Sequence, residues 1–433
     1  MRPSSAAGTT LPSMSGCHAE VMKVRHTVVI GAGIVGLATA RELAARDTSA
    51  RVTVLDKELA VAAHQSSHNS GVVHAGVYYQ PGSLKAQLCV EGRRLLEEFC
   101  DEHGIDFERC GKVVVATSPS ELAALDEIER RARANLVPGL RRVDRAGLED
   151  LEPHAGGIAA LHSPSTAIVD YDAVAHAIAG SGLFDLRLGF DVASIRRLRS
   201  ELVVSAKAVK GATAGGAADA REPILADRVV ICGGLDADRL SESAGHRPAA
   251  TIVAFRGEYW RLRPDRSHLA RGLIYPVPDP RYPFLGVHFT KRVGGAVDIG
   301  PNAVLALARE GYRWSDVDRR YLARTCASPA FLRMAAGNWR AGWHELAGSL
   351  SKRLFVDRAA QLLPEMTVGD VIRGPAGVRA QALGPDGALL DDFVVERFGE
   401  GGNVVSVINA PSPAATSALA IGRYIADRVL TGS

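Results

Sequence analysis

The spacing of apolar residues divides the first hundred positions into alternating strands and helices. A β-branched run at 27–30 precedes a glycine-rich turn, an amphipathic pattern over 33–46 and a second apolar run at 52–55. The runs predict two neighbouring strands, and the 3.6-residue spacing between them predicts a helix. A further helix is expected over 83–103, where leucines recur at helical spacing.

The remainder of the chain continues this alternation without an internal repeat. Strands are predicted at 112–116, 186–195, 201–206, 227–232 and 404–408, and helices at 119–135, 171–180 and within 413–430. The pattern is strand-rich from 251 to 300 and helical from 315 to 365. A Gly/Ala-rich stretch at 211–220 predicts the exposed end of a hairpin.

This order of elements predicts two interleaved domains. A chain of 433 residues is longer than one hydrophobic core usually serves. The predicted division assigns residues 25–110, 141–250 and 371–433 to a discontinuous nucleotide-binding domain, residues 111–140 and 251–370 to a substrate domain, and residues 1–24 to a flexible tail. The substrate is expected between the two domains.

The glycine-rich turn has the features of a dinucleotide site. Gly31 permits a tight turn, Gly33 allows a pyrophosphate to approach the backbone, and Gly36 lets the helix pack close to the strand. The free N–H groups at the helix N-terminus would bind the pyrophosphate. Asp56 follows the second strand, where a carboxylate can accept hydrogen bonds from a ribose.

Composition excludes several classes of function. The formal net charge is +3 with no lysine-rich tract, which argues against a nucleic-acid partner. The six cysteines show no CxxC spacing, so neither a metal site nor a disulfide framework is expected. No apolar run reaches the roughly 18 residues that a membrane span needs.

A flavin is favoured over a nicotinamide cofactor. The second strand is followed by a polar loop at about 60–82 instead of another regular βαβ unit. The segment 409–417 consists of small residues before a helix, whose N–H groups can face flavin carbonyls, although it can also simply cap that helix. The strand ending at Gly233 is another expected contact with the cofactor.

Several long segments resemble one known family, the L-2-hydroxyglutarate dehydrogenases and oxidases. These are FAD enzymes of the D-amino-acid-oxidase-like superfamily, and the resemblance extends from about Arg25 to Leu430. The segments that carry it are 68–79, 81–86, 255–259, 275–278, 284–290, 300–306, 375–382 and 409–417. Two departures are Asp56, where the family commonly has glutamate, and Ser67, where members often have glycine.

The resemblance implies both fold and activity. The fold would be α/β, with a Rossmann-type FAD-binding domain interleaved with a mixed-sheet α+β substrate domain. The reaction would be oxidation of L-2-hydroxyglutarate to 2-oxoglutarate, by hydride transfer from C2 to flavin N5 with a histidine as base. Electrons would pass to a quinone or to oxygen. The expected location is cytoplasmic or peripheral on the inner membrane, which is mitochondrial in a eukaryote, and a peripheral membrane contact is left open.

The resemblance and the fingerprint together give a set of cofactor residues. The residues expected to bind FAD are Gly31, Gly33, Gly36, Asp56, Lys57, His68, Asn69, Ser70, Gly71, Val192, Gly233, Pro413, Ala414 and Ala415.

The proton step points to histidine, whose ordinary pKa lies near neutrality. His74 is favoured as the catalytic base, because related flavoproteins pass this loop along the flavin ring. His288, on a predicted strand of the substrate domain, is the second candidate. Each could instead be a structural histidine bonded to the backbone. His64 lacks neighbours that suggest a reacting centre.

A dicarboxylate substrate needs two anion anchors, for which the arginine fork is well suited. Arg379 resembles the carboxylate-binding arginine of amino-acid oxidases. Arg256 is the second expected anchor, with an ion pair to Glu258 as the alternative. Tyr275 is expected to donate a hydrogen bond to substrate, or else to belong to the aromatic core. Lys85 is expected at the surface.

Two other functions stay open at this point. The same fold could oxidise another small hydroxy acid, an amine or glycerol phosphate. A flavin-binding protein with a non-catalytic or tRNA-modifying role is the third alternative, which the near-neutral charge disfavours.

Overall fold

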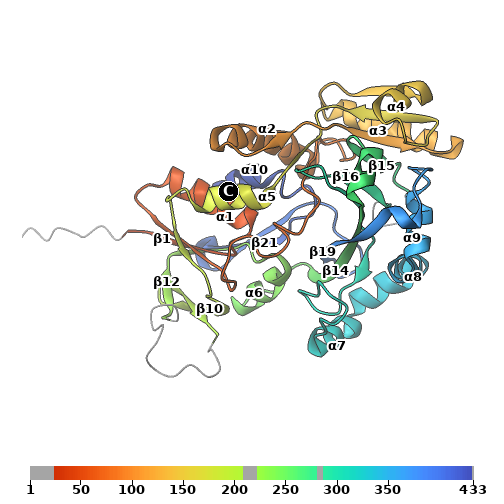
Figure 1. Cartoon of the computed structure of the whole chain (residues 1–433). Coiled ribbons are helices and arrows are strands. Elements are labelled where there is room, and N and C mark those ends of the chain that lie inside the picture. The colour runs from red at the N-terminus through yellow and green to blue at the C-terminus, as the bar shows by residue number, and fades with distance from the viewer. Residues whose placement is uncertain (1–23, 208–221, 280–285, 432–433) are drawn as a thin grey trace, which may run out of the picture.

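A six-stranded sheet carries the glycine-rich turn at its centre (Figure 1). The computed structural model describes residues 24–207, 222–279 and 286–431. The predicted tail, apart from Val24, and the predicted hairpin end at 211–220 lie outside these residues. The strands, in spatial order, are β20 (Val394–Phe398), β21 (Val404–Asn409), β13 (Arg228–Ile231), β1 (His26–Ile30), β2 (Arg51–Leu55) and β9 (Asp185–Arg187). All neighbours pair in parallel except β20 with β21.

Alternate residues of this sheet face two different layers, because successive side chains of a strand point to opposite faces. Val29 and Val54 pack against a helical layer, whereas Val28 and Leu55 pack against a small antiparallel sheet. The helices of the first layer are α1 (Ile34–Arg46), α2 (Leu84–His103), α5 (Tyr171–Ala179) and α10 (Ala418–Leu430). The second layer contains α6 (Ala237–Ser243), β10 (Val192–Leu198), β11 (Glu201–Ala206) and β12 (Ile224–Ala226).

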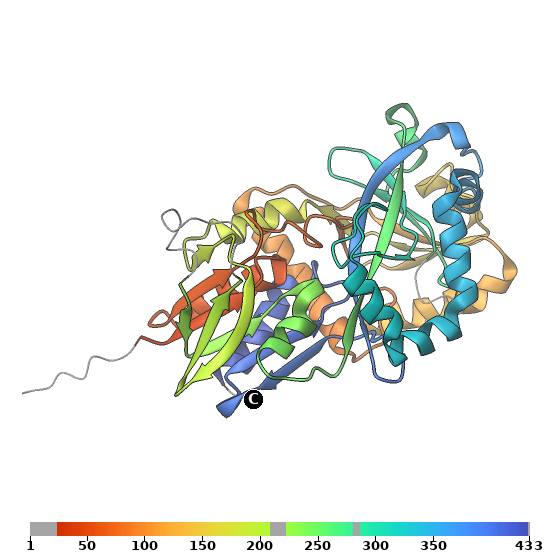
Figure 2. The ribbon, with the colours of Figure 1, turned by 90° about the horizontal axis from the view of Figure 1, so that it is seen from below.

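A nine-stranded mixed sheet forms the other half of the molecule. Its two longest strands, β14 (Thr251–Leu262) and β19 (Val371–Leu383), run antiparallel side by side, as Figure 2 shows. The others are β5 (Lys112–Ala116), β6 (Arg141–Asp144), β7 (Ala159–Ser163), β15 (Leu273–Pro276), β16 (His288–Lys291), β17 (Val297–Gly300) and β18 (Val304–Leu305). The helices of this half are α3 (Leu122–Ala134), α4 (Arg145–Leu151), α7 (Arg319–Ala327), α8 (Pro329–Leu350) and α9 (Lys352–Ala359).

Another three-stranded sheet lies beside the polar loop. It consists of β3 (Val72–Val73), β8 (Ala167–Val169) and β4 (Phe107–Glu108). The Gly71 carbonyl accepts the Val169 N–H at 2.9 Å, so this pairing fixes where the loop at 60–82 enters the space between the larger sheets.

Several boundaries differ from the sequence prediction. β6 and β7 pair beside β5, and β19 pairs with β14, so these strands lie in the nine-stranded sheet, whereas the predicted division assigns 141–250 and 371–433 to the nucleotide-binding domain. The expected strand at 186–195 is two strands, separated by Gly189, whose φ is +73°. Periodicity identifies strands but does not reveal their sheet partners, which depend on distant residues. The domain division itself stays a prediction.

Candidate active site

A single large cavity of about 1060 Å³ extends from the glycine-rich turn to the nine-stranded sheet. It is lined by residues of β1, β2 and the loop at 60–82, by the end of β13, by β15, β16 and β19, and by the segment before α10. All of the site residues predicted from the sequence line it except Gly71 and Arg256. The two larger sheets therefore share one site.

The glycine-rich turn forms one end of the cavity. Gly31 has φ +112°, and a Cβ there would collide with the carbonyl of Cys232. A Cβ on Gly36 would collide with the Gly31 carbonyl, so α1 can approach β1 only without a side chain there. A Cβ added to Gly33 would have one neighbour within 4 Å, the Ser66 hydroxyl oxygen at 3.1 Å, so no backbone atom crowds this position. This is the geometry that a pyrophosphate needs at a helix N-terminus.

Asp56 closes the turn at the end of β2. Its Oδ2 accepts the N–H of Ala32 at 2.6 Å, and its Oδ1 accepts the N–H of Glu58 at 2.9 Å. The carboxylate therefore fixes the turn and also lines the cavity. Its position at the C-terminal end of a parallel strand is where ribose hydroxyls are bound in this class of sheet.

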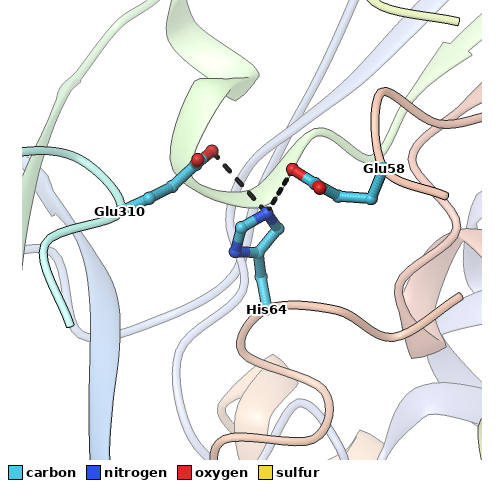
Figure 3. A group of neighbouring side chains, drawn as sticks. All are labelled: Glu58, His64 and Glu310. Atoms are coloured by element: carbon cyan, nitrogen blue, oxygen red, sulfur yellow. Dashed lines mark hydrogen bonds and ion pairs between the residues drawn. The ribbon is translucent and has the colours of Figure 1, made fainter. Parts of the chain in front are cut away.

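A polar cluster flanks this end of the cavity (Figure 3). His64 Nε2 lies 3.0 Å from Glu58 Oε1 and 3.7 Å from Glu310 Oε1. The Lys57 ammonium pairs with Glu310 and, at 2.9 Å, with Asp236. Lysine thus supplies the cation for these carboxylates, and the cluster joins the loop after β2 to the segment that follows β18. Lys57 contributes to the wall of the cavity through this network.

The polar loop is held by its own side chains. Asn69 Nδ2 donates to the carbonyls of Gln65 and Ser66, and its Oδ1 accepts the Gly71 N–H at 2.8 Å. His68 Nδ1 lies 3.0 Å from the His64 carbonyl. Asn69, His68 and Ser70 line the cavity, but Gly71 faces Val169 and Arg292 instead. The predicted contact of Gly71 with the cofactor stays a prediction, since Gly71 does not line the cavity and its positive φ serves the entry into β3.

His74 lies where the polar loop meets the segment before α10. Its backbone N–H donates to Thr416 Oγ1 at 3.1 Å, and its ring Nε2 lies 3.3 Å from Ser412 Oγ. Burial, helped by the positive charge of Lys112, lowers the pKa of His74 to about 3. The ring is therefore neutral near pH 7 and able to accept a proton.

His288 and Tyr275 stand on neighbouring strands at the same end of the cavity. Their rings stack with centroids 4.0 Å apart. His288 Nδ1 lies 2.9 Å from the Gly286 carbonyl, so Nδ1 carries the proton and Nε2 is the acceptor. Burial, together with the charges of Arg379 and Lys112 and against the bond to Gly286, lowers the pKa of His288 to about 3.

Arg379 brings positive charge to these histidines. It lies on β19, lines the cavity and acts electrostatically on both His288 and Tyr275. A hydrogen bond joins it to Tyr259, whose pKa is raised by burial and lowered again by Arg379. The guanidinium is thus oriented by a buried phenol from β14. His74, His288, Tyr275 and Arg379 consequently form one group at the cavity, while their roles in catalysis and substrate binding stay predictions.

Arg256 is not part of this group and does not line the cavity, so its role as a substrate anchor stays a prediction without support from the geometry. In the β14–β19 pairing, Phe255 opposes Arg379 whereas Arg256 opposes Val378, which places the two arginines on opposite faces. Arg256 is fully buried, stacks over Trp314 at 4.0 Å and lies 3.5 Å from Glu258. These contacts agree with the alternative given for Arg256, an ion pair with Glu258 on one face of the strand.

The segment before α10 forms the wall opposite the nine-stranded sheet. Pro413, Ala414 and Ala415 line the cavity, as do Gly233 at the end of β13 and Val192 at the start of β10. Residues 412–417 form turns, and α10 begins at Ala418, five residues later than the earliest predicted start. Small side chains therefore leave backbone groups exposed to the cavity at this point.

Sequence reasoning missed several residues of the site. Lys112 and Tyr259 lie on strands whose apolar neighbours suggested only core packing, and Ser412 and Thr416 contact His74 across 338 and 342 residues. Lys85, expected at the surface, is buried, lines the cavity and pairs with Asp391 at 2.7 Å. The usable signal was membership of the resembling segments, which contain Tyr259 (255–259), Lys85 (81–86), and Ser412 and Thr416 (409–417).

The residues present fit an adenine dinucleotide. The glycine-rich turn, Asp56 and the open side of Gly33 stand at one end, and the histidine group stands at the other. We expect Gly33→Val to lose most of its bound flavin, because the branched side chain would enter the space for the pyrophosphate. Flavin absorbance per protein after gel filtration measures this. Gly342→Val, whose added Cβ meets nothing within 4 Å, is the control, and full occupancy in Gly33→Val would contradict the role.

Comparison with known sequences identifies close relatives. A family model described as FAD dependent oxidoreductase matches residues 26–428. The chain is 45% identical over 407 residues to mitochondrial L-2-hydroxyglutarate dehydrogenase of Nematostella vectensis, covering 92% of this chain and 89% of that protein. It is 42% identical to the human mitochondrial enzyme of that name, covering 98% and 92%. Identity to the Escherichia coli K12 L-2-hydroxyglutarate dehydrogenase is 40%, covering 93% of each.

Solved structures share the fold at low identity. L-α-glycerophosphate oxidase from Mycoplasma pneumoniae, described with FAD bound, superposes with a TM-score of 0.73 at 19% identity, covering 95% of each chain. Glycine oxidase from Geobacillus kaustophilus gives 0.67 at 18% identity, covering 94% of this chain and 95% of that one. The predicted fold class is confirmed.

Proposed function

Because the chain belongs to the family of FAD dependent oxidoreductases, and its relatives at 40–45% identity are L-2-hydroxyglutarate dehydrogenases, we propose that it oxidises L-2-hydroxyglutarate to 2-oxoglutarate. One observation supports this beyond the relatives' names. A neutral histidine and a cavity-lining arginine meet at the end of the cavity remote from the glycine-rich turn. A 2-hydroxy acid needs this pair, one group for its hydroxyl proton and one for a carboxylate.

FAD is the cofactor of this enzyme, as predicted. When bound, FAD supplies the acceptor for the two electrons and the hydrogen that leave C2 of the substrate. The glycine-rich turn, Asp56 and the segment 412–417 are the groups that would hold it. The backbone N–H groups of the turn match the pyrophosphate of the dinucleotide, and the Asp56 carboxylate matches its ribose.

The chain's own residues then handle the substrate's charges. Arg379, oriented by Tyr259, binds a carboxylate and keeps C2 in place. His74 Nε2 takes the hydroxyl proton as the C2–O bond becomes a carbonyl, and Ser412 Oγ steadies the ring. Tyr275 and His288 complete the wall, with His288 Nε2 as the second candidate base.

Anaerobic mixing tests the proposed reaction. L-2-hydroxyglutarate should bleach the flavin absorbance of the purified protein, with 2-oxoglutarate formed in equal amount. Glycerol 3-phosphate, glycine and L-lactate are the comparison compounds, since each belongs to a competing assignment. Faster bleaching by one of them than by L-2-hydroxyglutarate would overturn the proposal. Oxygen and a quinone are both proposed as the electron acceptor, and the rates of reoxidation by air and by a soluble quinone distinguish them.

A membrane contact has support from the surface of α8. No helix among the described residues is long and apolar enough to cross a membrane. On α8, however, Trp339 and Trp343 are 64% and 69% exposed, and the exposed Leu350 extends the same helical stripe beyond the kink at Asn338. Helix α8 lies on the outside of the molecule (Figure 2). Exposed tryptophans beside arginines, here Arg340, favour the interface of an anionic lipid bilayer.

We expect the protein to float with anionic liposomes. The double variant Trp339→Ser with Trp343→Ser should bind them more weakly, with each change lowering the affinity on the order of tenfold. Leu198→Ser, an exposed apolar change on β10 at the other end of the molecule, is the control. Equal flotation of the double variant and the wild type would contradict a lipid-binding role for α8. If the wild type floats and the double variant does not, a quinone becomes the stronger alternative for the electron acceptor, since quinones reside in the bilayer.

A further inference from the structure

Lys112 is a buried cation behind the substrate end of the cavity that none of the assigned roles uses. Its side chain is 1% exposed. Its Nζ lies 4.5 Å from the ring centroid of Tyr78 and 5.1 Å from that of Tyr275. Both rings line the cavity, whereas Lys112 itself does not. The ammonium therefore stands in a second layer, against the outer faces of two aromatic side chains.

No carboxylate among the described residues forms an ion pair with Lys112. Burial lowers its pKa to about 7, and only the Cys89 thiol opposes this shift. A buried lysine without an anion is costly for stability, so such groups mark functional sites more often than structural ones. The neighbouring Tyr78 hydroxyl is also buried and has no hydrogen-bond partner in the described part of the chain.

The charge of Lys112 reaches both candidate bases. It lowers the pKa of His74, for which it is the largest influence after burial, and it lowers the pKa of His288. Arg379 on β19 adds a second positive charge that acts on His288. Arg256, which the sequence assigned as the second anchor, faces away. The histidine end of the cavity is thus positive through Arg379 and Lys112.

We propose that Lys112 is a positioning residue for a doubly charged substrate. From behind Tyr78 and Tyr275, the positive charge of Lys112 makes the electrostatic potential at the histidine end of the cavity positive. The inference rests on the proposed dicarboxylate substrate. In a low-dielectric interior, a unit charge acts strongly on an anion several ångströms away without touching it. The ammonium also discourages a proton on His74 before the substrate arrives. Substrate carboxylates then offset that charge and allow His74 to accept the hydroxyl proton.

The titration of Lys112 gives the proposal a measurable signature. Anion binding favours the protonated lysine, so affinity for a dicarboxylate should fall as the pH rises through about 7. The groups that interact with Lys112 from the packed elements are Tyr78 and His74 from the polar loop, Cys89 from α2, Tyr275 from β15 and His288 from β16. The charged groups Lys85 from α2 and Arg379 from β19 line the same cavity and act on these histidines. Burial raises the pKa of both tyrosines and of Cys89, while the pKa of both histidines is about 3.

Glutarate, an unreactive dicarboxylate, is the probe. Its dissociation constant with the FAD-loaded protein should rise on the order of tenfold between pH 6 and pH 8.5, as followed by the flavin difference spectrum. Lys112→Met should bind weakly at both values, without this rise. Lys112→Arg keeps a fixed charge and should bind tightly at both. Lys352→Met removes another lysine that lies over an aromatic ring, 5.2 Å from Trp260, and should behave as the wild type.

The outcomes separate this inference from the proposed function. A rise that persists in Lys112→Met, or in Lys112→Arg if the methionine variant does not fold, overturns the role of Lys112 alone. Wild-type protein that is reduced by L-2-hydroxyglutarate but binds glutarate equally at every pH also overturns it alone. Wild-type protein that neither binds glutarate nor is reduced by L-2-hydroxyglutarate overturns both.

Discussion

His74→Ala should slow reduction of the bound flavin by L-2-hydroxyglutarate by roughly 100- to 10,000-fold, the usual range for loss of a general base. The expectation follows from the position and the protonation state of the ring. His74 lines the cavity beside the C-terminal segment, and Ser412 Oγ lies 3.3 Å from its Nε2. Its lowered pKa keeps the ring neutral before the substrate binds, so one ring nitrogen is free of a proton. Stopped-flow absorbance under anaerobic conditions measures the rate.

His288→Ala is the matched control, because His288 lines the same cavity and has the same lowered pKa. We expect it to weaken substrate binding more than it slows reduction at saturating substrate. A stalled His288→Ala beside a normal His74→Ala would transfer the role of base to His288. Wild-type rates in both variants would exclude a histidine base altogether.

The pH dependence supplies an independent check on the base. A group with a lowered pKa stays neutral at every pH above that value, so His74 should not lose its base function as the pH falls from 8 to 5. An exposed histidine would lose it near pH 6.5. A decline of the reduction rate centred near pH 6.5 that disappears in His74→Ala would show that burial does not control this residue.

The sequence was sufficient for the dinucleotide end of the site because its signals are local. Gly31, Gly36 and Asp56 belong to one strand–helix–strand unit, and the collision that a Cβ on Gly36 would cause, with the Gly31 carbonyl, occurs inside that unit. Gly71 shows the limit of this reasoning. Its positive φ was foreseeable from its type, but whether the turn faces a cofactor or a neighbouring strand depends on Val169, almost a hundred residues away.

The substrate end could be predicted only in part, since it is assembled from strands that are distant in sequence. Period-two spacing correctly placed Arg256 and Glu258 on one face of a strand. It did not reveal which face meets the cavity, because the pairing of Phe255 with Arg379 decides that. Lys112 begins a valine-rich strand and has no local feature of a functional residue. Its burial against Tyr78 and Tyr275 exists only in the folded chain.

Arg379→Lys should lower kcat/KM for L-2-hydroxyglutarate by roughly ten- to a hundredfold, or about 1.5–3 kcal/mol of transition-state stabilisation. Lysine keeps the charge but loses the planar fork that binds a carboxylate with two hydrogen bonds. It also loses the geometry of the bond to Tyr259. Flavin content should stay at the wild-type level, because Arg379 lies at the substrate end of the cavity.

Arg256→Lys makes this prediction specific to the cavity face of the sheet. Both changes replace a buried or half-buried arginine of the same strand pair, but Arg256 stacks on Trp314 on the opposite face. We expect Arg256→Lys to lower the melting temperature while leaving the Michaelis constant for L-2-hydroxyglutarate unchanged. Because a lost ion pair and a lost substrate anchor affect different quantities, one comparison of both variants separates them. A raised Michaelis constant in Arg256→Lys, with an unchanged one in Arg379→Lys, would reverse the assignment of the two arginines.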